Sequence, residues 1–173
     1  ACKPTKLKLQ KPLRQKLTVP MSKKPITTET RLIDSHCHLL DEPLYQKLPE
    51  IIQAAFTSGV DRFIVPCSHA NDFQTLAKLT AEYSCILPAF GIHPYYVAET
   101  ELHEALDQLQ HCLATHPHAL VGEIGLDFAD KFLSPVQRQQ QHAYFEAQLQ
   151  LAQQHQRPVI LHHRQSLDAM LKT

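Results

Sequence analysis

Two histidines separated by a single residue, His36 and His38, are the first residues whose types and spacing could support chemistry. They follow a short apolar run, and on an extended chain side chains two positions apart point the same way. Both imidazoles can therefore face one cation, and imidazole is a good ligand for Zn, Mn, Fe or Ni. The pair alone is a weak indication of a metal site, because the chain contains 12 histidines.

A carboxylate, Glu123, lies within the apolar segment 121–126. An unpaired carboxylate buried in such a segment would be very costly. No Lys or Arg lies between Lys78 and Lys131 to neutralise it. A cation is therefore the more economical partner for this carboxylate, although a basic residue from elsewhere in the fold would also serve.

Two further histidines, His93 and His162, each follow an apolar run, FGI and VIL respectively. Either one alone fits a structural histidine whose hydrogen bonds are satisfied. Together with the HxH pair and Glu123, however, they place a possible ligand at the end of four predicted strands. In parallel α/β folds the carboxyl ends of the strands form the edge where active sites assemble. The pattern therefore predicts a cation-binding active site at this edge.

Alternating apolar segments supply the elements that must position these residues. Continuous apolar runs predict buried strands, and apolar residues at helical spacing predict the helices between them. The predicted strands are 31–34, 63–66, 86–91, 119–126 and 158–162, and the predicted helices are 49–58, 71–83, 102–113, 135–155 and one that begins at Ser166. Asn71 is expected to cap the second helix. Ser134 and Gln137 are expected to form a capping box at the start of the fourth.

This order of elements predicts an α/β fold with a parallel sheet. A doubly wound sheet and a barrel both fit the alternation. The phosphate-binding motifs GxGxxG and GxxxxGK[ST] are absent, which removes the usual nucleotide-binding versions of such folds.

The charge pattern divides the chain into two regions. Residues 1–28 contain eight of the 17 basic residues and no acidic residue, so residues 29–173 carry a net charge of −8. Prolines interrupt any helix in the first region, and we expect residues 1–30 to form a basic, disordered leader. The functional alternatives for segment 1–28 are a nucleic-acid-binding arm and an organelle transit peptide. A further alternative is that residues 1–20 are sequence foreign to the native protein.

Five cysteines without a CxxC pair predict reduced thiols and a cytoplasmic protein. No apolar run approaches the roughly 18 residues of a membrane helix, so no membrane association is expected. We also expect no stable protein partner.

Four motifs carry a resemblance to a known family: SHCH at 35–38, GIHP at 91–94, GEIGLD at 122–127 and VILHHR at 159–164. In order and spacing they resemble the TatD family of metal-dependent deoxyribonucleases, and within it the YjjV-type bacterial branch. The resemblance covers about residues 31–173. It implies a TIM (β/α)8 barrel of the metal-dependent hydrolase type, with two divalent cations (Zn, Mg or Mn) at the carboxyl ends of the strands.

The same resemblance implies roles for individual residues. It makes His36 and His38 ligands of the first cation and His162 a ligand of the second, with Glu123 bridging both as the catalytic carboxylate. The residues that it places near the substrate, as phosphate contacts, are His93 and Arg164. The implied reaction is hydrolysis of a phosphodiester bond by a metal-activated water. The implied substrate is DNA or a small phosphoester.

The resemblance also predicts an incomplete barrel. A complete barrel of this kind needs about 250 residues, whereas residues 31–173 supply only five βα units. Strands six to eight, with a further histidine ligand and an aspartate ligand, have no counterpart in this sequence. Residues 31–173 are therefore expected to form an incomplete catalytic domain that is nearly inactive on its own.

Three alternatives remain open from the sequence. An amidohydrolase-like barrel also begins with HxH, but such enzymes often place a carboxylated lysine where this chain has Glu123. A PHP-type phosphoesterase is also led by HxH but does not account for GEIGLD. The third alternative is an inactive fragment or a non-catalytic binding protein.

Overall fold

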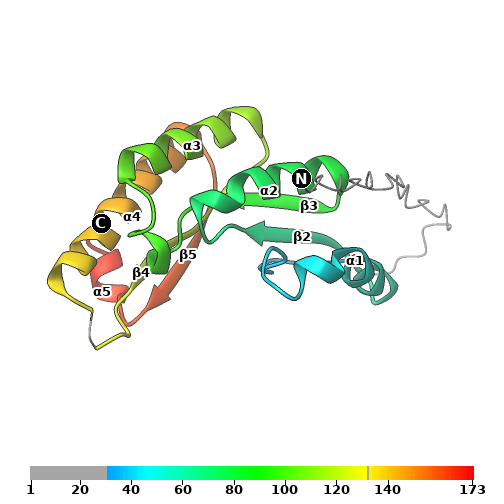
Figure 1. Ribbon diagram of the computed structural model, residues 1–173, viewed down its shortest axis with the longest axis horizontal. Helices are drawn as coiled ribbons and strands as arrows, with labels where there is room; N and C mark the ends of the chain where they lie inside the picture. The colour runs from blue at the N-terminus through cyan, green and yellow to red at the C-terminus, as the bar shows by residue number, and fades with distance from the viewer. Residues whose placement is uncertain (1–30, 132) are drawn as a thin grey trace, which may run out of the picture.

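The computed structural model describes residues 31–131 and 133–173, and the predicted leader at 1–30 lies outside the described residues. Strands and helices alternate along this part of the chain (Figure 1). The strands are β1 (Leu32–Asp34), β2 (Val60–Pro66), β3 (Ile86–Phe90), β4 (Leu120–Asp127) and β5 (Val159–Arg164). The helices are α1 (Leu48–Thr57), α2 (Phe73–Glu82), α3 (Leu102–Thr115), α4 (Pro135–Gln154) and α5 (Leu167–Met170).

The predicted strands and helices are confirmed in type and order, with differences at some ends. The Ser134–Gln137 capping box is also confirmed: the Gln137 amide donates to the Ser134 hydroxyl (3.2 Å), and the Gln137 side chain accepts from the Ser134 amide (2.9 Å). The prediction that Asn71 caps α2 is wrong. Residues Ala70–Asp72 form a 3₁₀ turn before the helix. The Asp72 carboxylate, rather than Asn71, accepts from the amide of His69 (3.1 Å).

The sheet is singly wound. All four strand pairings are parallel, and the spatial order β1-β2-β3-β4-β5 follows the chain. In a doubly wound sheet the spatial order of the strands reverses at one point along the chain. The order of these five strands shows no such reversal. The fold is therefore α/β with a sheet wound as in a barrel, of which the described chain forms five parallel strands.

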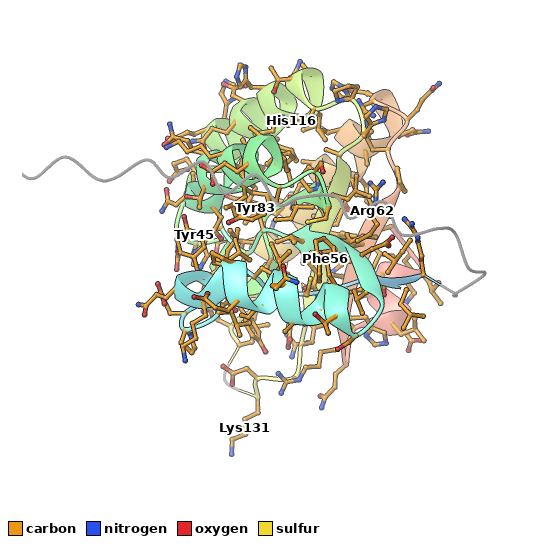
Figure 2. All side chains as sticks on the ribbon, turned by 90° about the vertical axis from the view of Figure 1, so that its right-hand side faces the viewer. Tyr45, Phe56, Arg62, Tyr83, His116 and Lys131 are labelled. Carbon is orange, nitrogen blue, oxygen red and sulfur yellow. The ribbon has the colours of Figure 1, made fainter. Side chains whose placement is uncertain are left out.

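The buried core lies between the sheet and its helices. In β2, Phe63 and Val65 are buried whereas Arg62 is exposed, as expected for alternating faces. Phe63 packs against Phe56 of α1, with ring centroids 6.3 Å apart; Figure 2 looks onto this helix. In the same core, Phe90 of β3 packs against Phe73 of α2, with ring centroids 5.6 Å apart. Burial of such side chains stabilises the fold by about 1.5–3 kcal/mol each.

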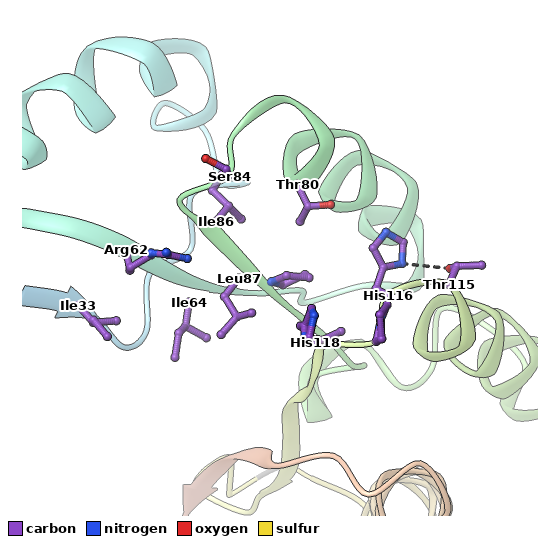
Figure 3. Close-up of a pocket in the computed structure, with 13 residues that line it drawn as sticks. Ile33, Arg62, Ile64, Thr80, Ser84, Ile86, Leu87, Thr115, His116 and His118 are labelled. Atoms are coloured by element: carbon purple, nitrogen blue, oxygen red, sulfur yellow. Dashed lines mark hydrogen bonds between the residues drawn. The ribbon is translucent and has the colours of Figure 1, made fainter. Parts of the chain in front are cut away.

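The opposite face of the sheet is open at the amino ends of the strands. Ile33, Ile64 and Leu87 line a cavity of about 550 Å³ there, together with residues from the loop between α3 and β4 (Figure 3). Ile33 of the edge strand β1 is 60% exposed on this face. In a closed barrel this inner face would be filled by side chains from the remaining strands.

The helices of the described chain are amphipathic or polar. Even α4, which has 20 residues, is rich in glutamine. None of the helices in residues 31–131 and 133–173 is long and apolar enough to cross a bilayer.

Candidate metal centre

His36 and His38 follow β1 and are held as a pair by the residue between them. The Cys37 amide donates to the Ile64 carbonyl of β2 (3.1 Å), and the Cys37 sulfur lies 3.5 Å from the same oxygen. Because alternate side chains of an extended segment point to opposite sides, the two imidazoles face the other way. Their Nε2 atoms lie 3.0 Å apart.

Glu123 reaches this pair from β4. The pairing of β4 with β5 shifts register between Val121 and Ile124, and Glu123 lies in this irregular stretch. Such irregularities often redirect a side chain next to an active site. Glu123 Oε2 lies 3.0 Å from His36 Nε2 and 3.4 Å from His38 Nε2.

The charge state of Glu123 is set by its surroundings. Burial by itself would raise its pKa, but hydrogen bonds and charges from His38, His36, His93 and His162 outweigh it and lower the pKa to about 2. The hydrogen bond to Glu123 in turn raises the pKa of His38, against the lowering effect of its burial. The centre is therefore built around an ionised carboxylate.

The donor atoms of His36, His38 and Glu123 fit a cation. The three atoms lie within 4.8 Å of one another. A proton can lie between only one pair of them at a time, whereas a divalent cation would satisfy all three together. Two imidazole nitrogens and a carboxylate oxygen also form a common ligand set for zinc.

The second oxygen of Glu123 points to a different histidine. Glu123 Oε1 lies 3.0 Å from Nδ1 of His162 on β5. On the other side of the ring, His162 Nε2 lies 2.8 Å from Asp127 Oδ2. Since a neutral imidazole carries one N–H, donation from Nε2 to Asp127 leaves the Nδ1 lone pair facing a carboxylate oxygen. A cation between Nδ1 and Glu123 would turn this repulsive contact into coordination.

Gly125 allows His162 to occupy this place. It is the residue of β4 that pairs with His162, midway between Glu123 and Asp127. A Cβ atom at Gly125 would lie 2.0 Å from the His162 carbonyl oxygen, which is far inside van der Waals contact. Glycine therefore lets β5 approach β4 closely, and the imidazole lies between the two carboxylates.

His93 joins the centre from the loop after β3. Its Nε2 lies 3.0 Å from His162 Nδ1, while its Nδ1 accepts from the Tyr95 amide (3.2 Å). Burial, with help from the nearby His162, lowers the pKa of His93 to about 4. The ring is therefore neutral near pH 7, with its proton on Nε2, and this N–H donates to the Nδ1 lone pair of His162. A cation bound at that Nδ1 would displace this hydrogen bond and leave the His93 N–H free.

Arg164 lies at the rim of the centre. It pairs with Asp127 in the sheet, and its guanidinium lies 3.8 Å from the Asp127 carboxylate. The guanidinium also donates to the Tyr95 hydroxyl (2.5 Å). The Arg164 side chain is 59% exposed, so it can meet an anion from solvent while it is held in place by these two partners.

The structure thus brings the predicted residues together. Each of the four predicted ligands has a donor atom within 3.4 Å of a donor atom of another predicted ligand. These ligands are His36, His38, Glu123 and His162. His93 adjoins His162, and Arg164 lies at the rim. His163, the residue after His162, is exposed and interacts with the Ser166 hydroxyl (3.3 Å) instead.

Two residues of the centre were not singled out in the sequence, Asp127 and Tyr95. Asp127 is the last letter of GEIGLD, so the motif contained it, but an aspartate at a strand end has no evident partner in the sequence. Its contact with His162 depends on the register between β4 and β5, which the sequence does not display.

Comparison with known proteins identifies relatives of this chain. A family model described as TatD related DNase matches residues 33–173. The chain is 35% identical over 142 residues to the uncharacterized metal-dependent hydrolase YjjV of Escherichia coli, covering 81% of this chain and 53% of that protein. It is 33% identical over 173 residues to the human 3′-5′ RNA nuclease TATDN2, covering 90% of this chain and 21% of that protein.

The fold comparison agrees with the sequence comparison. The crystal structure of the E. coli YjjV protein, a TatD homologue, matches with a TM-score of 0.75 at 33% identity. The match covers 82% of this chain and 54% of that structure. The chain therefore spans about half the length of this relative, in agreement with the predicted truncated barrel. These matches favour the TatD-type interpretation over the amidohydrolase-like and PHP-type alternatives.

Proposed function

Because the chain belongs to the family of TatD-related DNases, we propose that the protein to which it belongs is a metal-dependent hydrolase that cleaves phosphodiester bonds. The observation that supports this most strongly is the placement of Glu123. One carboxylate oxygen faces His36 and His38 and the other faces His162. A carboxylate shared between two sets of donors is the arrangement needed to hold two cations close together.

In this proposal His36, His38 and Glu123 hold one divalent cation, and Glu123 and His162 hold the other. Zinc, magnesium and manganese are the candidate ions. Two such cations, when bound, lower the pKa of a bound water and neutralise charge on a phosphate. Glu123 is the catalytic residue of this chain, since its ionised carboxylate contacts both positions.

The proposed substrate contacts are His93 and Arg164. The Nε2–H of His93 faces His162 Nδ1, and when a cation occupies that nitrogen the N–H can donate to a phosphate oxygen instead. The exposed guanidinium of Arg164 can pair with the same phosphate and favours it over a neutral ester. Both groups are held before substrate arrives, His93 by the Tyr95 amide and Arg164 by the Tyr95 hydroxyl.

Nucleic acid is the proposed substrate class. The family name specifies DNA and the relative TATDN2 is named an RNA nuclease, so the ends of single-stranded DNA or RNA are the best candidates. The net charge of −8 over residues 29–173 opposes broad duplex binding, which needs a basic surface. We further propose a cytoplasmic location, in keeping with the free thiols of Cys37, Cys67, Cys85 and Cys112.

The test is a nuclease assay of the full-length protein with Mg²⁺, Mn²⁺ or Zn²⁺. Substrates are 5′- and 3′-labelled single strands of DNA and RNA, the matching duplex, and bis(p-nitrophenyl) phosphate. We expect metal-dependent cleavage of single strands, its loss by at least 100-fold in Glu123→Gln, and wild-type activity in the control His163→Ala. Metal-independent cleavage, or an active Glu123→Gln variant, would contradict the proposal.

A further inference from the structure

Asp127 is a buried carboxylate beside the metal centre that belongs to neither group of candidate ligands. It ends β4, and its side chain is only 1% exposed. Its Oδ2 lies 2.8 Å from His162 Nε2, and its Oδ1 accepts from the Ala129 amide (3.0 Å). A buried carboxylate of this kind must be held by several partners to be tolerated.

The groups around Asp127 are those proposed to act in the reaction. Besides His162, the Arg164 guanidinium lies 3.8 Å from the Asp127 carboxylate. Arg164 and Tyr95 also contact each other. One carboxylate thus contacts a proposed metal ligand and a proposed phosphate contact.

The position of Asp127 is itself fixed by hydrogen bonds to Gln141 and Ala129. Its backbone amide donates to the side chain of Gln141 on α4 (2.9 Å), and Gln141 is buried. The Ala129 amide holds the other end of the carboxylate. The carboxylate therefore has little freedom to follow a movement of His162, and instead limits that movement.

The hydrogen bond to Asp127 decides which nitrogen of His162 is available. With the proton on Nε2, the imidazole donates to Asp127 and presents its Nδ1 lone pair to the space beside Glu123. The other tautomer would place an Nε2 lone pair 2.8 Å from a carboxylate oxygen and an N–H where a ligand atom is needed. Partners of this kind commonly set the tautomer, the orientation and the basicity of a metal-binding histidine.

We propose that Asp127 is a positioning residue: it holds His162 with Nδ1 available for the second cation, and the same carboxylate holds the Arg164 guanidinium beside the centre. This inference rests on the proposed function, because it takes His162 as a metal ligand. It adds that the occupancy of the second cation and the placement of the phosphate contact are linked through one buried side chain.

The experiment measures metal binding rather than activity. Zn²⁺ is titrated into the metal-free full-length protein against a chromophoric chelator, and the visible absorption spectrum of the Co²⁺-loaded protein reports ligand geometry. We expect Asp127→Ala to lower the affinity for the second ion roughly 10–100-fold and to alter the absorption bands of Co²⁺ at that position. The first ion should bind as in the wild type. Asp127→Asn retains an acceptor oxygen of the same shape, and it should restore part of this affinity.

A matched control is available in the pair His69–Glu99, where the His69 Nδ1 lies 2.8 Å from the Glu99 carboxylate. His69 belongs to neither candidate metal group, so Glu99→Gln should leave both affinities and the Co²⁺ spectrum unchanged.

Two negative outcomes can be separated. If His162→Ala loses the second ion but both Asp127 variants bind it like the wild type, the positioning role is wrong and the proposed function stands. If His162→Ala binds metal like the wild type, the ligand role of His162 fails, and the proposed two-cation centre and the positioning role fail with it.

Discussion

At the scale of single residues, the centre depends on side chains that each contact two others. Glu123 uses one oxygen for the HxH pair and the other for His162. His162 uses one nitrogen toward each of two carboxylates. Removal of any one of these groups therefore leaves a buried polar atom unpaired, as well as removing a ligand.

Substitution of Glu123 should have the largest effect on metal content. Glu123→Ala removes the side chain that lies against both the HxH pair and His162, so the full-length variant should retain less than one divalent cation per molecule. Elemental analysis after dialysis checks this. His163→Ala, a histidine neighbouring a proposed ligand, should keep the wild-type content. A Glu123→Ala variant with undiminished metal would exclude the bridging role.

The cysteines should be nearly inert in the native protein. Burial is the main reason that the pKa of Cys37 is raised to about 12 and that of Cys112 to about 11. The thiolate fraction at pH 8 is then roughly 0.1% or less. In a Cys2→Ser variant of the 173-residue chain, Ellman's reagent should therefore titrate no thiol within minutes at pH 8, and four thiols after unfolding in guanidinium. Rapid reaction of the native variant would show that the HxH segment, with Cys37, opens readily.

At the scale of elements, the pairing of β4 with β5 decides the geometry of the centre. Gly125 pairs with His162, and Asp127 pairs with Arg164. A shift of this register by one residue would turn His162 to the other face of the sheet. Residues that fix the register are therefore as important to the site as the ligands.

Gly125→Ala should destabilise this pairing more than a glycine substitution elsewhere. The new Cβ would meet the His162 carbonyl at 2.0 Å, in a residue whose φ is +151°. We expect the free energy of unfolding to fall by about 3 kcal/mol, measured by urea denaturation. The control is Gly59→Ala, where φ is +91° and no atom lies within 4 Å. It should cost about 1 kcal/mol, and equal losses would contradict the close approach.

Local sequence patterns predicted the strands and helices well, because each strand or helix is specified largely by residues close together in the sequence. Apolar runs and helical spacing indicated all five strands and the helices between them, and the Ser134–Gln137 cap needed only two residues three positions apart. The Asn71 cap failed because a 3₁₀ turn, Ala70–Asp72, precedes the helix. The Asp72 carboxylate bonds back to the amides of Ser68 and His69, and the sequence alone does not display that turn. Contacts such as Asp127–His162 span 35 residues, and the sequence alone does not specify them.

At the scale of the whole molecule, the choice between a doubly wound sheet and a barrel also needed the structure. Both folds share the alternation of strands and helices, and only the spatial order of the strands separates them. The resemblance to TatD proteins implied the barrel, and the unreversed order β1 to β5 confirms that winding. The edges at β1 and β5 and the open cavity follow from a sheet that is wound but not closed.

The 173-residue chain, expressed alone, should self-associate. The edge strands carry exposed apolar side chains, among them Leu161 at 50% exposure, and exposed edges pair readily with other chains. Light scattering coupled to gel filtration should show oligomers or aggregates, and Leu161→Glu should raise the monomer fraction. Leu171 is 77% exposed but lies outside the strands, so Leu171→Glu should not. A monomeric wild-type chain would contradict this expectation.

The unreversed strand order matters for how the chain folds during synthesis. Each strand pairs with the one made just before it, so a nascent chain leaving the ribosome can extend the sheet without waiting for distant segments. His36, His38 and Glu123 are all complete before His162 is made, 39 residues after Glu123. At about 5–20 residues per second this interval is roughly 2–8 s. An ion captured in that interval would tie β1 to β4 across the growing sheet, and the metal would serve first as a folding ligand and only later in catalysis.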